Sequence, residues 1–184
     1  MKLRRWLGLG AAAGGAALGY ALLEARWYTL RRVAVAVLPA GAAPLRLLHI
    51  SDLHLTAGQR RKVEWVRGLA DLAPDLVVAT GDNYSSADAM EVALEALEPL
   101  LAFPGAFVLG SHDHYSAVFK NPLTYLAGRK HARQSLARTP DLPAEAFAGV
   151  LQRAGWHRLD NARASLRLGP AGMATDLVGL AVPH

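Results

Sequence analysis

The sequence of 184 residues contains no cysteine. This absence excludes a disulfide framework and a zinc site built from thiolates, so a metal ion would have to be held by histidine, aspartate, asparagine or water. Charged residues are also scarce, at 19% of the chain, whereas 52% of the residues are hydrophobic. A chain of this length and composition can bury a sizeable core, and it fits one domain with an appendage.

A second missing feature is a basic patch with interleaved aromatic residues, on which nucleic-acid bases could stack. The net charge of +5 comes from scattered arginines and a few short basic clusters. We therefore expect no nucleic-acid partner. The clusters are interpreted as solvated surfaces and membrane flanks, with attraction to anionic lipids or phosphate substrates as the alternative.

Charge is also absent from Trp6 to Leu23, a run that follows a short basic start. As a helix it would extend about 27 Å, close to the thickness of a bilayer core. Aromatic residues lie near both ends, as at membrane interfaces: Trp6, Tyr20, Trp27 and Tyr28. We expect an uncleaved single-pass anchor over residues 1–28 and a membrane localisation. A cleaved signal peptide and a soluble helix rich in glycine and alanine are the alternatives.

Three short runs are apolar throughout and predict buried strands over residues 45–50, 76–79 and 106–109. Between these strands, apolar residues recur at helical spacing and predict helices. They do so over residues 61–72 and at Met90, Leu94, Leu97 and Leu101. Alternating strands and helices predict an α/β fold with a parallel sheet. Alternation of Val33, Val35 and Val37 predicts one more strand over 32–38.

The C-terminal part is less regular. Residues 116–131 are expected to form a polar loop, and a helix is predicted to begin with Pro143 at its first position and to continue to Ala154. Three short strands are predicted at 156–159, 164–168 and 176–182, with antiparallel pairing.

Polar residues follow each of the three buried strands, at intervals that suit a strand-helix-strand unit. They are Asp52 and His54, then Asp82 and Asn83, then His112, Asp113 and His114. A parallel sheet brings such ends side by side. Asp52 and His54 are two residues apart, so on an extended chain they would point the same way. The pattern predicts a metal site at this edge, while His49, inside the strand, is expected in the core.

The motifs Asp-x-His, Gly-Asp-Asn and Gly-Ser-His-Asp occur in this order. They resemble the calcineurin-like metallophosphoesterases, whose pattern is D-x-H, G-D-x-x, G-N-H-[DE], an isolated His and G-H-x-H. The segments SDLHL, TGDN and GSHDHY look most like the membrane-anchored bacterial branch. The resemblance implies a layered α-β-β-α core over residues 29–184, with an incomplete second sheet, preceded by the transmembrane helix.

The resemblance also implies two divalent ions, of Mn, Fe, Zn or Mg, and hydrolysis of phosphate mono- or diesters. By its pattern, Asp52 and His54 would bind one ion and Asp82 would bridge both. His112 would lie near the leaving group as a proton donor or electrostatic stabiliser, oriented by Asp113. An anchored enzyme would suit a lipid-linked substrate.

Three positions are less defined by this resemblance. Ser111 stands where the family has an asparagine ligand, and a neutral hydroxyl is a poorer ligand. Asn83 is either a turn residue that tolerates left-handed geometry or a site residue. As a site residue it would contact substrate, support the ligands from behind or replace the missing ligand of the second ion. His114 either contacts phosphate or faces solvent.

The last histidines of the family pattern are missing. After His114 only His131, His157 and His184 follow, and no G-H-x-H occurs. We therefore expect this chain to be a C-terminally truncated version of a longer enzyme. The alternative is a non-catalytic or one-metal membrane protein that keeps the phosphoesterase fold.

Overall fold

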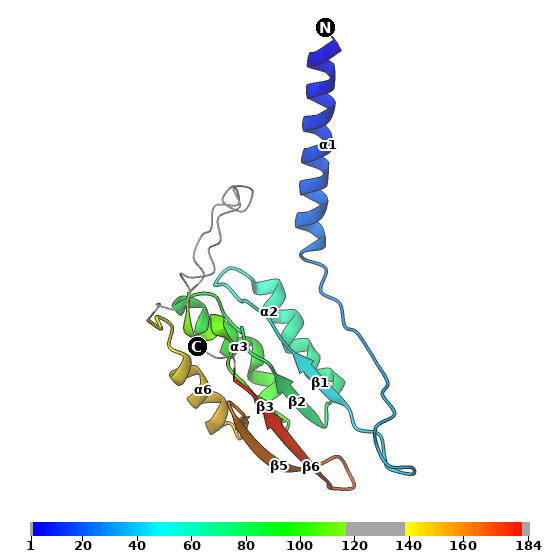
Figure 1. Ribbon diagram of the computed structural model, residues 1–184, viewed down its shortest axis with the longest axis vertical. Coiled ribbons are helices and arrows are strands. Elements are labelled where there is room, and N and C mark those ends of the chain that lie inside the picture. Colours follow the sequence, from blue (N-terminus) through cyan, green and yellow to red (C-terminus); the bar gives the residue numbers. More distant parts are fainter. Residues whose placement is uncertain (1, 117–138, 182–184) are drawn as a thin grey trace. The chain divides into compact units, whose positions relative to one another are not determined.

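The computed structural model describes residues 2–116 and 139–181 (Figure 1). The chain divides into two compact units, Met1–Val37 and Leu38–His184. The polar loop predicted over 116–131 lies, from residue 117 onward, outside the described residues.

The N-terminal unit contains one long helix, α1 (Lys2–Glu24), where the membrane anchor was expected. No helix in the described part of the chain is long and apolar enough to span a bilayer. The transmembrane helix expected over residues 1–28 is therefore not found. Glycine and alanine make up much of this stretch, and their side chains carry little apolar surface.

The strand predicted over residues 32–38 is also not present. The side chains of Val33, Val35 and Val37 are 81%, 67% and 76% exposed, and the described strands do not pair with this segment. A strand is stabilised by hydrogen bonds to a neighbouring strand, so an alternating pattern without a partner does not form one.

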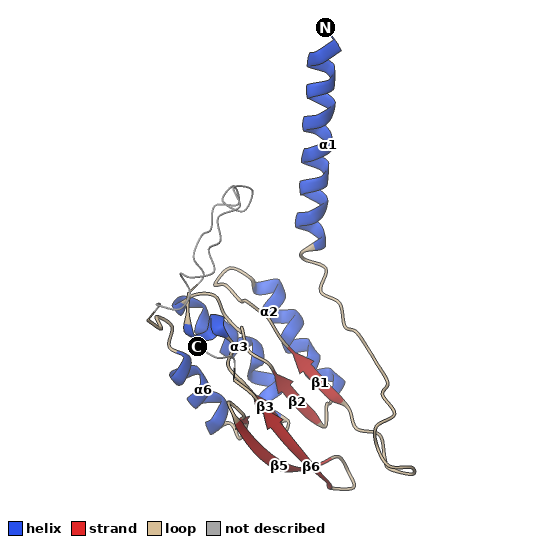
Figure 2. Cartoon of the chain, viewed as in Figure 1, coloured by secondary structure: helices blue, strands red, loops and turns tan. Residues whose placement is uncertain are grey.

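Four parallel strands form the main sheet, in the order β1-β2-β3-β4. The first three are labelled in Figure 2. They are β1 (Leu47–Ile50), β2 (Leu76–Ala79), β3 (Gly105–Phe107) and β4 (His157–Arg158). Ile50 pairs with Ala79, and Ala79 with Phe107, so the first three strands end together. The α/β fold and its parallel sheet are as predicted.

The fourth strand corrects one prediction. Residues 156–159 were expected to pair in antiparallel fashion, but β4 lies parallel to β3, with Phe107 opposite Arg158. The preceding helix, α6 (Ala144–Arg153), acts as a crossover that returns the chain to the same end of the sheet. Trp156 fixes the entry to β4, because its indole packs against Gly105, where any side chain would overlap it.

Helices bury the core against this sheet. They are α2 (Arg60–Arg67), continued by η1 (Gly68–Leu72), and α3 (Met90–Leu97), flanked by η2 (Ala87–Ala89) and η3 (Glu98–Ala102). The buried residues of the α3 segment are Ala93, Ala96, Leu97 and Leu100. The face predicted from Met90, Leu94 and Leu101 is therefore displaced, and the buried positions lie one residue earlier in the chain. The alanines let α3 approach its neighbours closely.

A separate hairpin is formed by β5 (Ala162–Leu168) and β6 (Met173–Gly179), which are antiparallel as predicted. Its two ends contact the main sheet. Gly179 packs against Leu159, just after β4, while Gly169 at the turn lies against Leu45, just before β1. The hairpin thus runs from one side of the sheet to the other.

Strand β1 is buried on one face only. Leu48 and Ile50 point into the core, whereas Leu47 is 56% exposed and His49 is exposed as well. The expectation that His49 packs in the core is therefore wrong. Because β1 is the edge strand, its outer face lacks cover, and the His49 ring instead meets the Thr80 hydroxyl, with Nε2 at 2.8 Å from Oγ1.

Candidate metal centre

Two loops meet beyond the carboxyl ends of β1 and β2. Backbone N–H groups of the first loop donate to carbonyls of the second: Asp52 to Gly81 at 3.1 Å, His54 to Asp82 at 2.8 Å, and Leu55 to Asn83 at 3.0 Å. Leu55 and Tyr84 form an isolated parallel bridge. The pairing of β1 with β2 thus continues into the loops and brings their side chains together.

The backbone at the three central residues is left-handed. The φ angles are 54° at Asp52, 42° at His54 and 56° at Asp82. Aspartate and histidine adopt this region more readily than most residues, yet it remains uncommon. Asp52 and His54 therefore share one side for a reason other than the extended alternation that we expected, since the chain has left the strand at Ile50.

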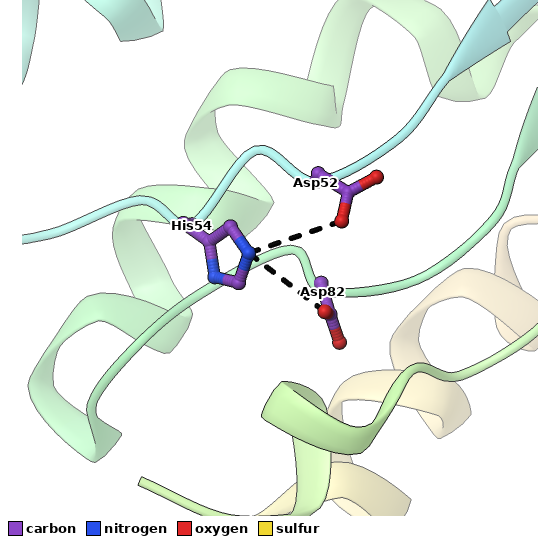
Figure 3. A group of neighbouring side chains, drawn as sticks. All are labelled: Asp52, His54 and Asp82. Carbon is purple, nitrogen blue, oxygen red and sulfur yellow. Dashed lines mark ion pairs between the residues drawn. The ribbon is translucent and has the colours of Figure 1, made fainter. Parts of the chain in front are cut away.

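The side chains of Asp52, His54 and Asp82 form one cluster (Figure 3). One ligand atom from each lies within 4.8 Å of the others. His54 Nε2 is 3.9 Å from Asp52 Oδ1 and 3.7 Å from Asp82 Oδ2. The side chains are 39%, 66% and 18% exposed for His54, Asp52 and Asp82, so the cluster is open to solvent on the side of Asp52.

This donor set fits a divalent cation. Bonds of about 2.0–2.2 Å around one ion separate neighbouring ligand atoms by roughly 3–3.5 Å, so slight inward movement of the side chains would complete the contact. Two carboxylates and an imidazole suit Mn, Fe, Zn or Mg. In the described residues, this is the group of acidic and histidine side chains that could hold a metal.

Comparison with known proteins supports the same interpretation. A sequence profile described as calcineurin-like phosphoesterase matches residues 45–159, which is 115 of the 184 residues. The chain belongs to the calcineurin-like phosphoesterase family. This family comprises hydrolases that act on phosphoric ester bonds. The three clustered residues and Ser111 to His114 all fall inside the matched range.

One curated relative is similar over a shorter stretch of this chain. The chain is 43% identical over 75 residues to "Probable inactive purple acid phosphatase 28" of Arabidopsis thaliana. The similarity covers 38% of this chain and 17% of the relative. The chain therefore matches only a small part of that protein.

Asp113 lies behind the cluster and fixes the loop next to it. Its side chain is fully buried, and its carboxylate accepts backbone hydrogen bonds from Asn83 at 2.7 Å and from Asp82 and Gly110, each at 2.9 Å. Burial raises the pKa of the Asp113 carboxyl, while these hydrogen bonds oppose the shift. The carboxylate thus holds the loop that carries Asp82.

The role expected for Asp113 differs from this. It was predicted to orient the His112 ring, but its carboxylate is occupied by the loop, and His112 Nδ1 is buried with no hydrogen-bond partner in the described part of the chain. The two residues are neighbours on a short helical turn, α4 (Ser111–His114).

Asn83 also lies behind the cluster. Its side chain is 2% exposed and its Nδ2 donates to both Asp113 oxygens, at 3.3 and 3.2 Å. Asn83 thus supports the cluster from behind through Asp113, and its contact with substrate stays a prediction. Next to it, the Tyr84 hydroxyl donates to the Asp113 carbonyl at 3.1 Å, and burial raises the pKa of Tyr84. Sequence reasoning missed Tyr84. The pattern that could have indicated it is an aromatic residue directly after the Gly-Asp-Asn motif.

Asp82 and His112 are held together through the backbone. The His112 N–H donates to Asp82 Oδ1 at 2.8 Å, which leaves Oδ2 directed at His54. The rings of His54 and His112 meet edge to face, with centroids 4.9 Å apart. The structure thus brings His112 beside the cluster of Asp52, His54 and Asp82.

Ser111 and His114 lie at the two ends of α4. Ser111 is half-buried at its first position. His114 accepts hydrogen bonds from the N–H groups of Asp141 and Leu142 through its carbonyl, and its ring lies 6.3 Å from that of Tyr115. His114 as a whole is half-buried.

Lys62 is a further residue that sequence reasoning missed, because it lies in one of the short basic clusters that were interpreted as solvated surfaces. Its ammonium group donates to the Leu53 carbonyl, between Asp52 and His54. Burial lowers the pKa of Lys62. The signal was helical spacing: Lys62 precedes the buried Val66 by one turn, so it lies at the edge of the apolar face of α2.

Proposed function

We propose that this chain hydrolyses phosphate mono- or diesters with divalent ions held at Asp52, His54 and Asp82. The observation that supports this most is the convergence of the three ligand atoms within 4.8 Å, at the ends of two parallel strands. Family membership supports a phosphate ester as the substrate class.

Asp52, Asp82 and His112 would have different roles, because they lie at different places in the site. Asp52, the most exposed of the three, faces the approach of substrate, whereas Asp82 is held by the His112 N–H. A bound divalent cation would neutralise phosphate charge and act as a Lewis acid. We propose that His112 donates a proton to the leaving oxygen or stabilises its charge, since its ring lies beside that of His54.

A second ion is part of this proposal. Ser111 would contribute to it at the position where the family has asparagine, and Asp82 would bridge to it. Asp82 Oδ1 already accepts a hydrogen bond from His112, and a serine hydroxyl is a weak ligand. We therefore expect the second ion to bind less tightly than the first.

The test is hydrolysis of a chromogenic phosphodiester and a phosphomonoester in the presence of Mn²⁺. We expect metal-dependent turnover that falls at least a hundredfold in Asp82→Ala, because this change removes a ligand. Asp88→Ala, at an exposed position on η2, is the matched control. No metal-dependent turnover in the unmodified chain, or full turnover in Asp82→Ala, would contradict the proposal.

A second candidate is a non-catalytic or one-metal protein that keeps the fold. Two observations favour it: Ser111 replaces a family ligand, and the printed name of the Arabidopsis relative calls that protein probably inactive. Metal analysis after purification without chelators separates the two candidates. One ion per chain without turnover favours the second candidate, and two ions with turnover favour the first.

We also propose membrane association and a lipid-linked substrate, as in the membrane-anchored bacterial branch. This proposal rests on the basic and apolar sequence of residues 1–28. Carbonate extraction of membranes tests it directly. Recovery of the chain in the carbonate-soluble fraction would contradict an anchor.

A further inference from the structure

The loop that carries two of the three clustered ligands is fixed along one side by the neighbouring loop. The N–H groups of Asp52, His54 and Leu55 donate to carbonyls of residues 81–83. Between Asp52 and His54, the backbone forms an arch (Figure 3). The side chain of Leu53 is buried and its carbonyl accepts the hydrogen bond from Lys62.

Lys62 reaches this carbonyl from a rigid element. It lies in the first turn of α2, whose Val63 and Val66 are buried in the core. Lys62 is half-buried and its hydrogen bond to the Leu53 carbonyl is partly buried, so solvent competes less for this contact. A charged donor of this kind makes a stronger hydrogen bond than a neutral one.

The backbone on both sides of Leu53 needs such support. Asp52 and His54 both have positive φ angles, and a peptide held in this region relaxes unless its surroundings fix it. Rotation of the Leu53 peptide would turn Asp52 and His54 apart and break the cluster. The hydrogen bond from Lys62 opposes that rotation directly.

We propose that Lys62 is a positioning residue of the metal centre: its ammonium holds the Leu53 carbonyl and thereby sets the spacing of Asp52 and His54. This inference rests on the proposed function, because it concerns the same site. Lys62 touches neither ion nor substrate and acts through the backbone.

The direction in which removal of Lys62 changes the affinity for a cation separates a positioning role from a purely electrostatic one. Lys62 carries a positive charge close to a cation site, so its removal by itself would reduce repulsion and tighten cation binding. Loss of a positioning contact has the opposite effect, since residues that orient ligands typically account for ten- to a hundredfold in metal affinity. The two mechanisms therefore predict opposite shifts.

The experiment titrates the full chain with Mn²⁺ by calorimetry, in the unmodified protein and in Lys62→Met, Lys62→Arg and Arg61→Met. We expect Lys62→Met to bind Mn²⁺ about tenfold more weakly or worse. Lys62→Arg keeps a charged donor and should restore most of the affinity. Arg61→Met removes the same charge from an exposed neighbour and should not weaken binding. Unchanged or tighter binding in Lys62→Met would overturn the proposal.

Amide hydrogen exchange of the metal-free chain gives a second, independent measurement. The peptide that contains residues 51–56 should exchange faster in Lys62→Met than in the unmodified chain, and not in Arg61→Met. Equal exchange in all three would overturn the role of Lys62. Absence of Mn²⁺ binding in the unmodified chain would overturn the metal centre itself, while the exchange comparison would still decide whether Lys62 holds the loop.

Circular dichroism establishes that each variant is folded before it is compared. Should Lys62→Met fail to fold, Lys62→Gln replaces it, because its shorter, neutral side chain removes the charged contact with a smaller change in polarity. The same weakening of Mn²⁺ binding and the same faster exchange are expected. Affinity and exchange equal to those of the unmodified chain would overturn the proposal.

Discussion

At the scale of single residues, Asp82 shows how one carboxylate can join three parts of the site. Oδ1 accepts the N–H of His112 from α4, and Oδ2 lies 3.7 Å from His54 on the first loop. Its own backbone N–H donates to Asp113. A change at Asp82 therefore alters the metal site and the junction of β2 with α4 together.

Asp113 provides the first prediction. We expect Asp113→Asn to lower the free energy of unfolding by about 2–4 kcal/mol, because the new amide group faces backbone donors and leaves at least one without an acceptor. Urea denaturation followed by circular dichroism measures this. The same change at the exposed Asp88 should cost less than about 0.5 kcal/mol. Equal stability of the two variants would contradict the bracing role of Asp113.

At the scale of elements, the ends of β2 and β3 touch through two glycines. A Cβ atom on Gly81 would lie 2.3 Å from the Gly110 nitrogen, and one on Gly110 would lie 2.1 Å from Asp82 Oδ1. This close approach lets the loops after the strands share hydrogen bonds. It explains physically why glycine precedes both the Asp82 and the Ser111 positions.

Gly110→Ala tests this contact without backbone strain, since the φ angle of Gly110 is −94°. The added methyl group would displace the Asp82 carboxylate. We expect a loss of about 1–3 kcal/mol in unfolding free energy and weaker Mn²⁺ binding by calorimetry. Gly58→Ala, where a Cβ meets open space, is the control. Gly110→Ala with unchanged Mn²⁺ affinity would contradict the steric account.

An ion-pair network joins α6 and β4 to the segment that follows β3. Arg158 donates two hydrogen bonds to Glu145, at 2.7 and 3.0 Å, and one to Asp160 at 2.6 Å. Asp160 in turn accepts the N–H of Leu109 at 3.0 Å. The hydrogen bond from Arg158 is the main cause that lowers the pKa of Glu145 below its ordinary 4.5.

A lowered pKa of a glutamate predicts a defined pH dependence. Glu145 stabilises the fold above its unfolded pKa of 4.5, and this contribution is lost as the pH falls through the lower folded pKa. We expect the unmodified chain to exceed Glu145→Gln in stability by less than about 1 kcal/mol at pH 7, since Glu145 is largely exposed. The difference should vanish toward pH 3 in urea denaturation. A difference independent of pH would contradict this linkage.

At the scale of the whole molecule, the metal centre should be coupled to the stability of the fold, because its ligands lie on loops that fold together. Mn²⁺ at a hundred times its dissociation constant should add about 2.7 kcal/mol. For a chain of this size that raises the melting temperature by about 5–10 °C. Thermal unfolding with Mn²⁺ and with EDTA measures it. A similar rise in Asp82→Ala would show that Mn²⁺ acts elsewhere.

Much of this architecture could be predicted from the sequence. Continuous apolar runs with helical spacing between them determine three parallel strands, and polar residues at their ends then have to meet at one edge. That is why Asp52, His54 and Asp82 could be predicted to cluster. The hairpin after Asn161 was also predicted, as short strands over residues 164–168 and 176–182 with antiparallel pairing.

What only the tertiary structure decided depends on neighbours that lie far along the chain. His49 is exposed because β1 is the edge strand of the sheet. Strand β4 is parallel to β3 because the chain returns through α6. The strand expected over residues 32–38 does not form, because it has no partner strand. The roles of Asp113 and Lys62 depend on which backbone groups they reach, and that is fixed by loop geometry with positive φ angles. The periodicity of a sequence predicts the direction of a side chain within a regular strand or helix. It does not predict that direction in a loop.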